Sequence, residues 1–227
     1  MSTATFRTIS AVAVLVVASL AGPARADVLL FQTATADPNA LINDNTLVLQ
    51  GDGTTAGNGF AGGSIMIGAD FTVTVPTVIA SIGASFGDTA LTAGSGAIFG
   101  AIVAVDPVTG LPTQPVETLS SITLGYSVFT PSTDGDTTTG LSVALQPGTY
   151  GIVFGSGLFG ATGVADLLHG EGPVGAPAIF SNIFAPFAAD ASDTDVRLFV
   201  NEVPEPASIA VLAVGGMVLS SLRRRRG

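Results

Sequence analysis

The stretch TVIASIGASF, residues 77–86, decides the fold class. Its side chains alternate between two kinds, with Val78, Ala80, Ile82, Ala84 and Phe86 on one side and Thr77, Ser81, Gly83 and Ser85 on the other. Successive side chains of a β-strand point to opposite faces of a sheet. The period of two therefore predicts a strand with one buried and one exposed face.

Nine further runs have the same strand-like composition. They are rich in Val, Ile, Thr and Phe and lie between turn residues: VLLFQT, TLVLQ, SIMIGADFTVTV, AIFGAIVAV, SITLGYSVF, LSVAL, GTYGIVF, AIFSNIF and VRLFV. AIFGAIVAV (97–105) is apolar on both faces, which is typical of a central strand. Short strands without a long amphipathic helix predict one all-β domain over residues 27–202, an antiparallel β-sandwich or jelly roll.

Glycine-rich and polar segments separate these runs. DPVTGLP (106–112) has the chemistry of a turn, and GDGTTAGNGFAGGS (51–64) and STDGDTTTG (132–140) are predicted to be loops. Residues 155–177 form the longest predicted gap between strands, with at most one helical turn over residues 164–168. GSGLFG (155–160) fits G-x-G-x-x-G, but no long helix follows it, so we interpret it as a loop and not as a dinucleotide site.

Composition excludes several classes of function. The 227 residues are 47% hydrophobic and 11% charged, so the chain can bury a core, and without cysteine it has no disulfide, zinc-thiolate site or catalytic thiol. Sixteen of the 17 acidic residues lie between Asp27 and Glu202, where Arg197 is the only arginine and there is no lysine, giving this interval a formal charge of −15 with His169 neutral. Such a domain repels nucleic acid and anionic lipid, so neither is expected as a partner.

The N-terminus has the pattern of a secretory signal peptide. Arg7 precedes an apolar run over residues 9–20, and Ala24-Arg25-Ala26 has the small-x-small form of a cleavage site before Asp27. A run of 12 residues is short for a membrane span, which needs about 20. We expect signal peptidase to remove residues 1–26.

The C-terminus combines an apolar segment with a basic cluster. Residues 207–222 carry no charge and as a helix would reach about 24 Å, short of a hydrocarbon core of about 30 Å. Snorkelling arginines and local thinning of the bilayer can compensate for the difference. Arg223, Arg224, Arg225 and Arg226 are expected to stop transfer and stay on the cytoplasmic side, which places the rest of the chain across the membrane.

The order of these C-terminal features carries a resemblance. Val203-Pro204-Glu205-Pro206, then an apolar helix, then an arginine cluster resembles the PEP-CTERM sorting signal of Gram-negative bacteria over residues 203–227, with Gly227 after the arginines as the one departure. The resemblance implies that an exosortase, a membrane-embedded cysteine transpeptidase-like enzyme, recognises Pro204, Glu205 and Pro206 and cuts near them. An ordinary tail anchor is the alternative.

The resemblance also implies a location. The domain would be exported to the cell envelope, outer surface or exopolysaccharide matrix of a Gram-negative bacterium, anchored only transiently through its C-terminal helix. The partners would be exosortase, signal peptidase and exopolysaccharide. The pattern around LQPGTYGIVF (145–154) is similar to the sandwich domains that often carry this signal.

One motif suggests a hydrolase. GASFG (83–87) fits the G-x-S-x-G elbow of serine hydrolases, with Ser85 as nucleophile and the sole histidine, His169, as base. That elbow needs a strand-to-helix turn, and no helix is predicted after Ser85. We therefore expect no catalytic residues, and the hydrolase remains the less favoured alternative.

Acidic residues offer oxygen atoms for calcium. The candidates are Asp134 and Asp136 in one cluster, and Asp190, Asp193 and Asp195 in another. Neither cluster has the twelve-residue EF-hand pattern, and Asp is also common in turns. No metal and no cofactor is predicted.

Three hypotheses on function follow. The leading one is a non-enzymatic surface or matrix protein, structural or adhesive, that is sorted by exosortase. The second is a calcium-binding or glycan-binding β-sandwich module, although the chain has no Trp and only two Tyr, the residues on which sugars usually stack. The third is the hydrolase based on Ser85 and His169.

Overall fold

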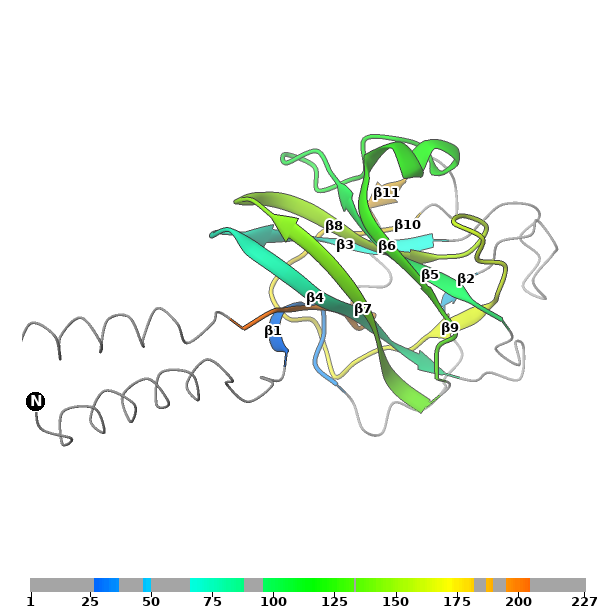
Figure 1. The fold of residues 1–227 in the computed structure, drawn as a ribbon. Helices are drawn as coiled ribbons and strands as arrows, with labels where there is room; N and C mark the ends of the chain where they lie inside the picture. Colours follow the sequence, from blue (N-terminus) through cyan, green and yellow to red (C-terminus); the bar gives the residue numbers. More distant parts are fainter. Residues whose placement is uncertain are drawn as a thin grey trace, which may run out of the picture. The chain divides into compact units, whose positions relative to one another are not determined.

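The computed structural model describes residues 27–36, 47–49, 66–87, 96–132, 134–181, 187–189 and 195–204. Residues 27–203 form one compact unit. Two antiparallel sheets pack face to face as a β-sandwich (Figure 1), which confirms the predicted sandwich. Among the described residues no helix has the length and apolar character to cross a bilayer, and both predicted terminal helices lie outside these residues.

Sheet one is built around its longest central strand. Its path runs through β1 (Val28–Gln32), β12 (Leu198–Glu202), β4 (Thr77–Gly87), β9 (Ala165–Leu167) and β2 (Leu47–Leu49). The other edge of β4 pairs along its length with β7 (Asp134–Leu145). Strand β4 thus contacts β7 on one side and β12 followed by β9 on the other.

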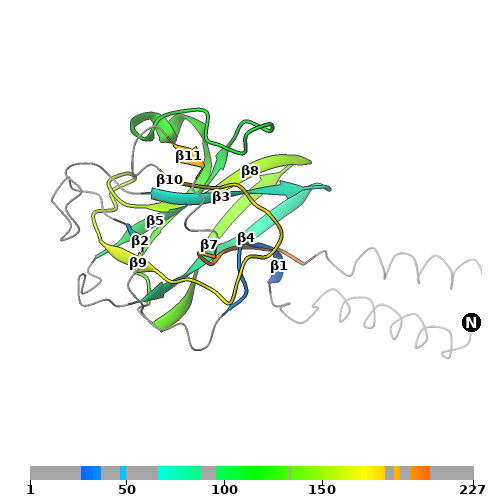
Figure 2. The same cartoon turned by 180° about the vertical axis from the view of Figure 1, so that it is seen from behind.

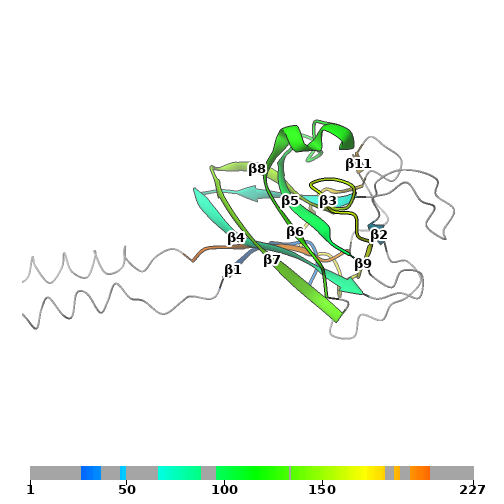
Figure 3. The ribbon, with the colours of Figure 1, turned by 45° about the vertical axis from the view of Figure 1, so that its right-hand side comes forward.

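Sheet two has the order β11 (Ala188–Ala189), β10 (Ile179–Ser181), β3 (Met66–Val73), β8 (Gly148–Gly155), β5 (Ile98–Ala104) and β6 (Thr123–Phe129). A 3-10 helix, η1 (Val116–Ile122), precedes β6. Figures 2 and 3 show η1, the green helix near β11, on the side of sheet two that faces away from sheet one.

The hydrophobic core has two layers, which explains why β5 is apolar on both faces. Ile98 and Ile102 belong to the cluster between the sheets, together with Ile82 and Phe86 of β4. Phe99 and Val103 point the other way, into a second cluster with Leu119 of η1. The prediction that AIFGAIVAV is a central strand is confirmed, since β5 pairs with both β6 and β8.

The opening stretch forms a strand, but not the half-buried one its pattern predicts. Ile82, Ala84 and Phe86 face the core as expected. A register shift between Ile79 and Ser81 breaks the alternation, so that Ile79 is buried and Val78 is exposed. Ser81 and Ser85 on the opposite face are also buried. The prediction of an exposed polar face is therefore wrong.

Three local predictions also differ from the structure. Residues 134–140, predicted as loop, form the first half of β7, and residues 165–167, predicted as helical turn, form β9. Helix η1 had no counterpart among the predicted elements. The segment 51–64 lies outside the described residues.

The predicted turn at residues 106–112 is present. The carboxylate of Asp106 accepts the N–H groups of Val108 and Thr109, at 2.7 and 3.0 Å, and these two bonds lower the pKa of Asp106 below its ordinary value. Gly110 takes a left-handed backbone with φ of 71°. The contribution of this turn to stability is present where Asp106 is ionised and is lost as the pH falls through its lowered pKa.

Gly83 shows why the outer face of β4 is closed. A Cβ at Gly83 would lie 2.3 Å from Cζ of Phe199 and 2.6 Å from the backbone oxygen of Thr137. The ring of Phe199 thus lies directly on the backbone of β4. Only glycine permits this approach.

We expect Gly83→Ala to destabilise the protein by about 1–3 kcal/mol, because the added methyl group overpacks against a ring and a fixed carbonyl. Gly140→Ala is the matched control in β7, since a Cβ there meets nothing within 4 Å. Urea denaturation measures both variants. Equal stabilities would contradict the close packing of Phe199 on β4.

Candidate functional site

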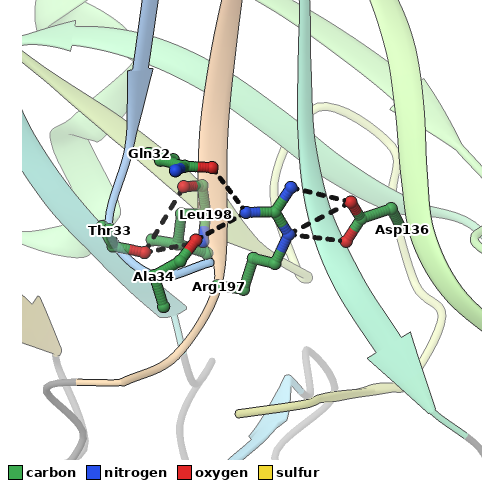
Figure 4. Close-up of polar contacts among 6 residues, drawn as sticks. All are labelled: Gln32, Thr33, Ala34, Asp136, Arg197 and Leu198. Carbon is green, nitrogen blue, oxygen red and sulfur yellow. Dashed lines mark hydrogen bonds and ion pairs between the residues drawn. The ribbon is translucent and has the colours of Figure 1, made fainter. Parts of the chain in front are cut away.

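The most connected polar group of the described domain is the guanidinium of Arg197. This residue immediately precedes β12 and is only 7% exposed, although it is the only arginine or lysine between Asp27 and Glu202. Figure 4 shows its side chain between the segment that follows β1 and strand β7. Burial of an unpaired charge is costly, so its partners determine whether the position is tolerable.

Asp136 of β7 is the charged partner. Nε of Arg197 donates to Oδ1 and Oδ2 of Asp136 at 2.9 and 3.1 Å, and Nη2 donates to Oδ2 at 2.8 Å. The two planar groups therefore meet side by side, the geometry in which Arg pairs most strongly with a carboxylate. The side chain of Asp136 is 36% exposed, so the pair sits at the edge of the solvent.

The other side of the guanidinium binds the chain near β1. Nη1 of Arg197 donates to Oε1 of Gln32 at 2.8 Å and to the backbone oxygen of Ala34 (Figure 4). The guanidinium also lies over the ring of Phe199, 4.9 Å from its centre, which adds a cation–π contact. One side chain thus joins β1, β7 and β12.

Thr33 makes a second link between the same strands. Its hydroxyl accepts the N–H of Leu198 at 2.8 Å and donates to the backbone oxygen of Val196, and its own N–H donates to the oxygen of Leu198 at 2.9 Å. Thr33 is fully buried. Together, Arg197 and Thr33 fasten the first strand of the domain to its last strand.

Ser85 lies close to this cluster. It is the register partner of Asp136, and its N–H donates to the oxygen of Arg197. Ser85 is buried in the interior of β4, which continues to Gly87. In a nucleophile elbow the serine is exposed on a sharp strand-to-helix turn, and the geometry at Ser85 differs from this.

His169 pairs with an aspartate. Its Nδ1 lies 2.6 Å from Oδ1 of Asp195, and both side chains are partly exposed. The neighbouring Leu168 donates its N–H to the oxygen of Ser85. The fold therefore gathers Ser85, Asp136, His169 and Asp195, which are far apart in sequence, at one part of sheet one.

The predicted calcium residues have different surroundings. Asp136 uses both oxygens on Arg197, and Asp195 is bonded to His169. Asp134 is in β7, whereas Asp190 and Asp193 lie outside the described residues. Among the described residues no three His, Cys, Asp or Glu gather as metal ligands.

The processing residues fall at the limits of the described chain. Asp27 accepts a hydrogen bond from Ser81 of β4 at 3.0 Å, and Ser81 in turn accepts one from Asn201 at 3.0 Å. Pro204 is the last described residue. The remaining predicted processing residues are outside the described part: Ala24, Ala26, Glu205, Pro206 and Arg223 to Arg226.

One aromatic pair beside sheet two combines an exposed ring, Tyr126, with a partly buried one, Phe159. Tyr126 of β6 is 51% exposed and stacks on Phe159, with ring centres 4.2 Å apart and an interplanar angle of 18°. Phe159 has a left-handed backbone with φ of 55°, which is costly for a residue with a side chain. The loop after β8 therefore carries backbone strain where it presents this ring.

No protein-family model matches the chain, and a search of curated proteins finds no relative.

Sequence reasoning counted Arg197 as the only arginine of the domain but gave it no role. A usable signal is present in VRLFV (196–200), where Arg interrupts an apolar run. A lone cation in such a run must be buried with a carboxylate or lie on an exposed face. The sequence does not show which of sixteen carboxylates is the partner.

We expect Asp136→Asn to destabilise the domain by about 1–2 kcal/mol, because it leaves the buried guanidinium without its counter-charge. Glu117→Gln, which removes an exposed carboxylate from η1, should change stability by less than about 0.5 kcal/mol. Urea denaturation compares the two variants. If both variants change the free energy of unfolding equally, the burial of Arg197 does not require the negative charge of Asp136.

Proposed function

We propose that the chain is a non-enzymatic surface or matrix protein that is exported, held briefly in the membrane and released by an exosortase. The observation that carries this proposal is the ordered sequence Val203-Pro204-Glu205-Pro206, apolar segment and arginine cluster, opposite a predicted signal peptide. The jelly-roll topology and the two terminal helices remain part of the proposal.

The domain structure supports this route. The compact unit begins at Asp27, directly after the predicted signal peptidase site, and ends at Val203, directly before Pro204, the first residue that exosortase is expected to recognise. Both processing reactions would then cut outside the sandwich. The strong negative charge of the domain also suits a protein that must stay soluble after release.

The polar cluster supports a structural role. Arg197 donates hydrogen bonds to Gln32, to Asp136 and to the backbone oxygen of Ala34. These bonds hold β1, β7 and the start of β12 together. Ser85 is buried within a strand. In this proposal the protein acts through its surface, as a scaffold or adhesin in the exopolysaccharide matrix, and the hydrolase alternative is the least supported.

Mapping both termini of the protein from its native host tests the proposal. In the medium we expect a start at Asp27 and an end near Pro204 to Pro206, without the RRRRG tail. A Pro204→Ala/Pro206→Ala variant should remain in the membrane fraction with its tail. Pro147→Ala, at an exposed turn outside the motif, should be processed normally. An intact tail on the wild-type surface protein would favour a plain anchor.

The second candidate function is glycan binding, and the Tyr126–Phe159 pair favours it. Flat, half-exposed aromatic rings are the surfaces on which sugar rings stack. Exposed Leu124 and Val128 lie on the same strand, β6. Calcium binding belongs to the same alternative, with Asp134, Asp136, Asp190, Asp193 and Asp195 as its candidates.

A thermal-shift panel tests this candidate. A matching oligosaccharide at 100 times its Kd adds about 2.7 kcal/mol of stability, so the melting temperature should rise by several degrees. The rise should disappear in Tyr126→Ala and persist in Val108→Ala, a control in the exposed 106–110 turn. Calcium with and without chelator forms a separate arm. If neither an oligosaccharide nor calcium raises the melting temperature, this candidate function is wrong.

A further inference from the structure

The described domain begins and ends at the same end of sheet one. Val28 of β1 pairs with Glu202 of β12, which pairs with Ile79 of β4. The N–H of Val203 donates to the oxygen of Val78 at 2.8 Å. Figures 1 and 3 show the blue start and the orange end of the domain on one side of the sandwich, where the turn between β3 and β4 also lies.

This end carries an exposed apolar surface. Ten large apolar side chains are exposed in the described part of the chain, and five of them, each between 42 and 54% exposed, are here: Val28, Leu29, Val75, Val78 and Val203. We call these five residues the terminal patch. In the register of sheet one, Leu29 is paired with Asn201, which is paired with Ser81. The adjacent row of the sheet consists of Val28, Glu202 and Ile79, so Leu29 and Val28 lie in neighbouring rows at this end.

The sequence fixes how far this patch can lie from a membrane. Val203 is followed after only three residues by the uncharged segment 207–222, the predicted span. Four residues of extended chain cover at most about 14 Å. Pro204 and Pro206 restrict the tether further, since proline fixes one backbone angle. An anchored precursor therefore holds the terminal patch within or beside the headgroup layer, which is about 5–8 Å thick.

We propose that the terminal patch lies against the lipid headgroup region of the bilayer that holds the C-terminal span. This inference rests on the proposed function, because it requires residues 207–222 to be inserted. Apolar side chains gain free energy when they leave water for the interface. The patch thus orients the sandwich with one end on the membrane and its aromatic pair away from it.

The charges at this end favour lipids without net charge. Asp27 and Glu202 lie in the described part, Glu205 follows in sequence, and no basic residue occurs between Arg197 and Arg223. Carboxylates repel anionic headgroups. Zwitterionic phosphatidylcholine vesicles are therefore the appropriate probe membrane.

A cysteine-free chain makes the test direct. The chain that remains after the predicted signal peptidase cut, residues 27–227, is reconstituted in phosphatidylcholine vesicles with one cysteine that carries an environment-sensitive fluorophore, at Val78→Cys or at Val128→Cys. The two valines are equally exposed, at 42 and 39%. In the register of sheet two, Val128 lies in one row with Phe99, Gly155 and Met66. Met66 is seven residues from Val73 along β3, so this row lies about 23 Å from the end of the sandwich that carries the terminal patch.

We expect quenching by doxyl-labelled lipids at least twofold stronger at residue 78 than at residue 128. A second comparison separates docking from simple proximity. With the fluorophore at Val203→Cys, the pair Leu29→Ser/Val78→Ser should reduce quenching at least twofold, whereas Leu124→Ser/Val128→Ser should leave it unchanged.

The outcomes separate the two proposals. If the protein does not float with the vesicles after a carbonate wash, the predicted span is wrong and the patch proposal falls with it. If it floats but the two positions are quenched equally, or if the patch serines change nothing, the span stands and the contact between patch and lipid is overturned.

Discussion

The sandwich depends on one buried cation. Arg197 sits at the start of the last strand of the domain, and its bonds to Gln32 and Asp136 reach the first strand and the middle of the chain. Because this interval of the sequence contains sixteen carboxylates and a single guanidinium, the domain carries strong self-repulsion that the pair offsets only locally. With partners on both β1 and β7, the buried guanidinium favours the observed arrangement of these strands around β12.

The same strands close the outer face of β4. Phe199, two residues beyond Arg197, supports the guanidinium on one side and lies against Gly83 on the other. Among the described residues, the polar cluster around Arg197 and the ring of Phe199 lie on the face of β4 that carries Gly83 and Ser85. This arrangement explains why small residues alternate along β4, a pattern that in isolation indicates exposure to solvent.

The fold class was predictable from the sequence, whereas the polar centre was not. Period-two runs such as residues 82–86 face the core as predicted, because alternation reports directly on a strand with one apolar face. The threonine and aspartate run 134–140 was predicted as loop because its composition suits turns, yet pairing with β4 makes it a strand. Contacts between Arg197, Asp136 and Gln32 span up to 165 residues of sequence, and no local pattern encodes such a distance.

The order of strands links folding to the proposed export route. β12 is the last described strand and lies between β1 and β4, so sheet one can close only when the chain is available as far as Glu202. In the proposed export route, closure would follow the passage of Glu202 across the membrane. Pro204 then lacks the N–H that would extend the ladder beyond Val203. The sorting motif would thus leave the sheet as unpaired chain once β12 has paired. Pairing of β12, held by Arg197 and Thr33, would thus complete the folded domain up to Glu202 and leave the processing site outside it.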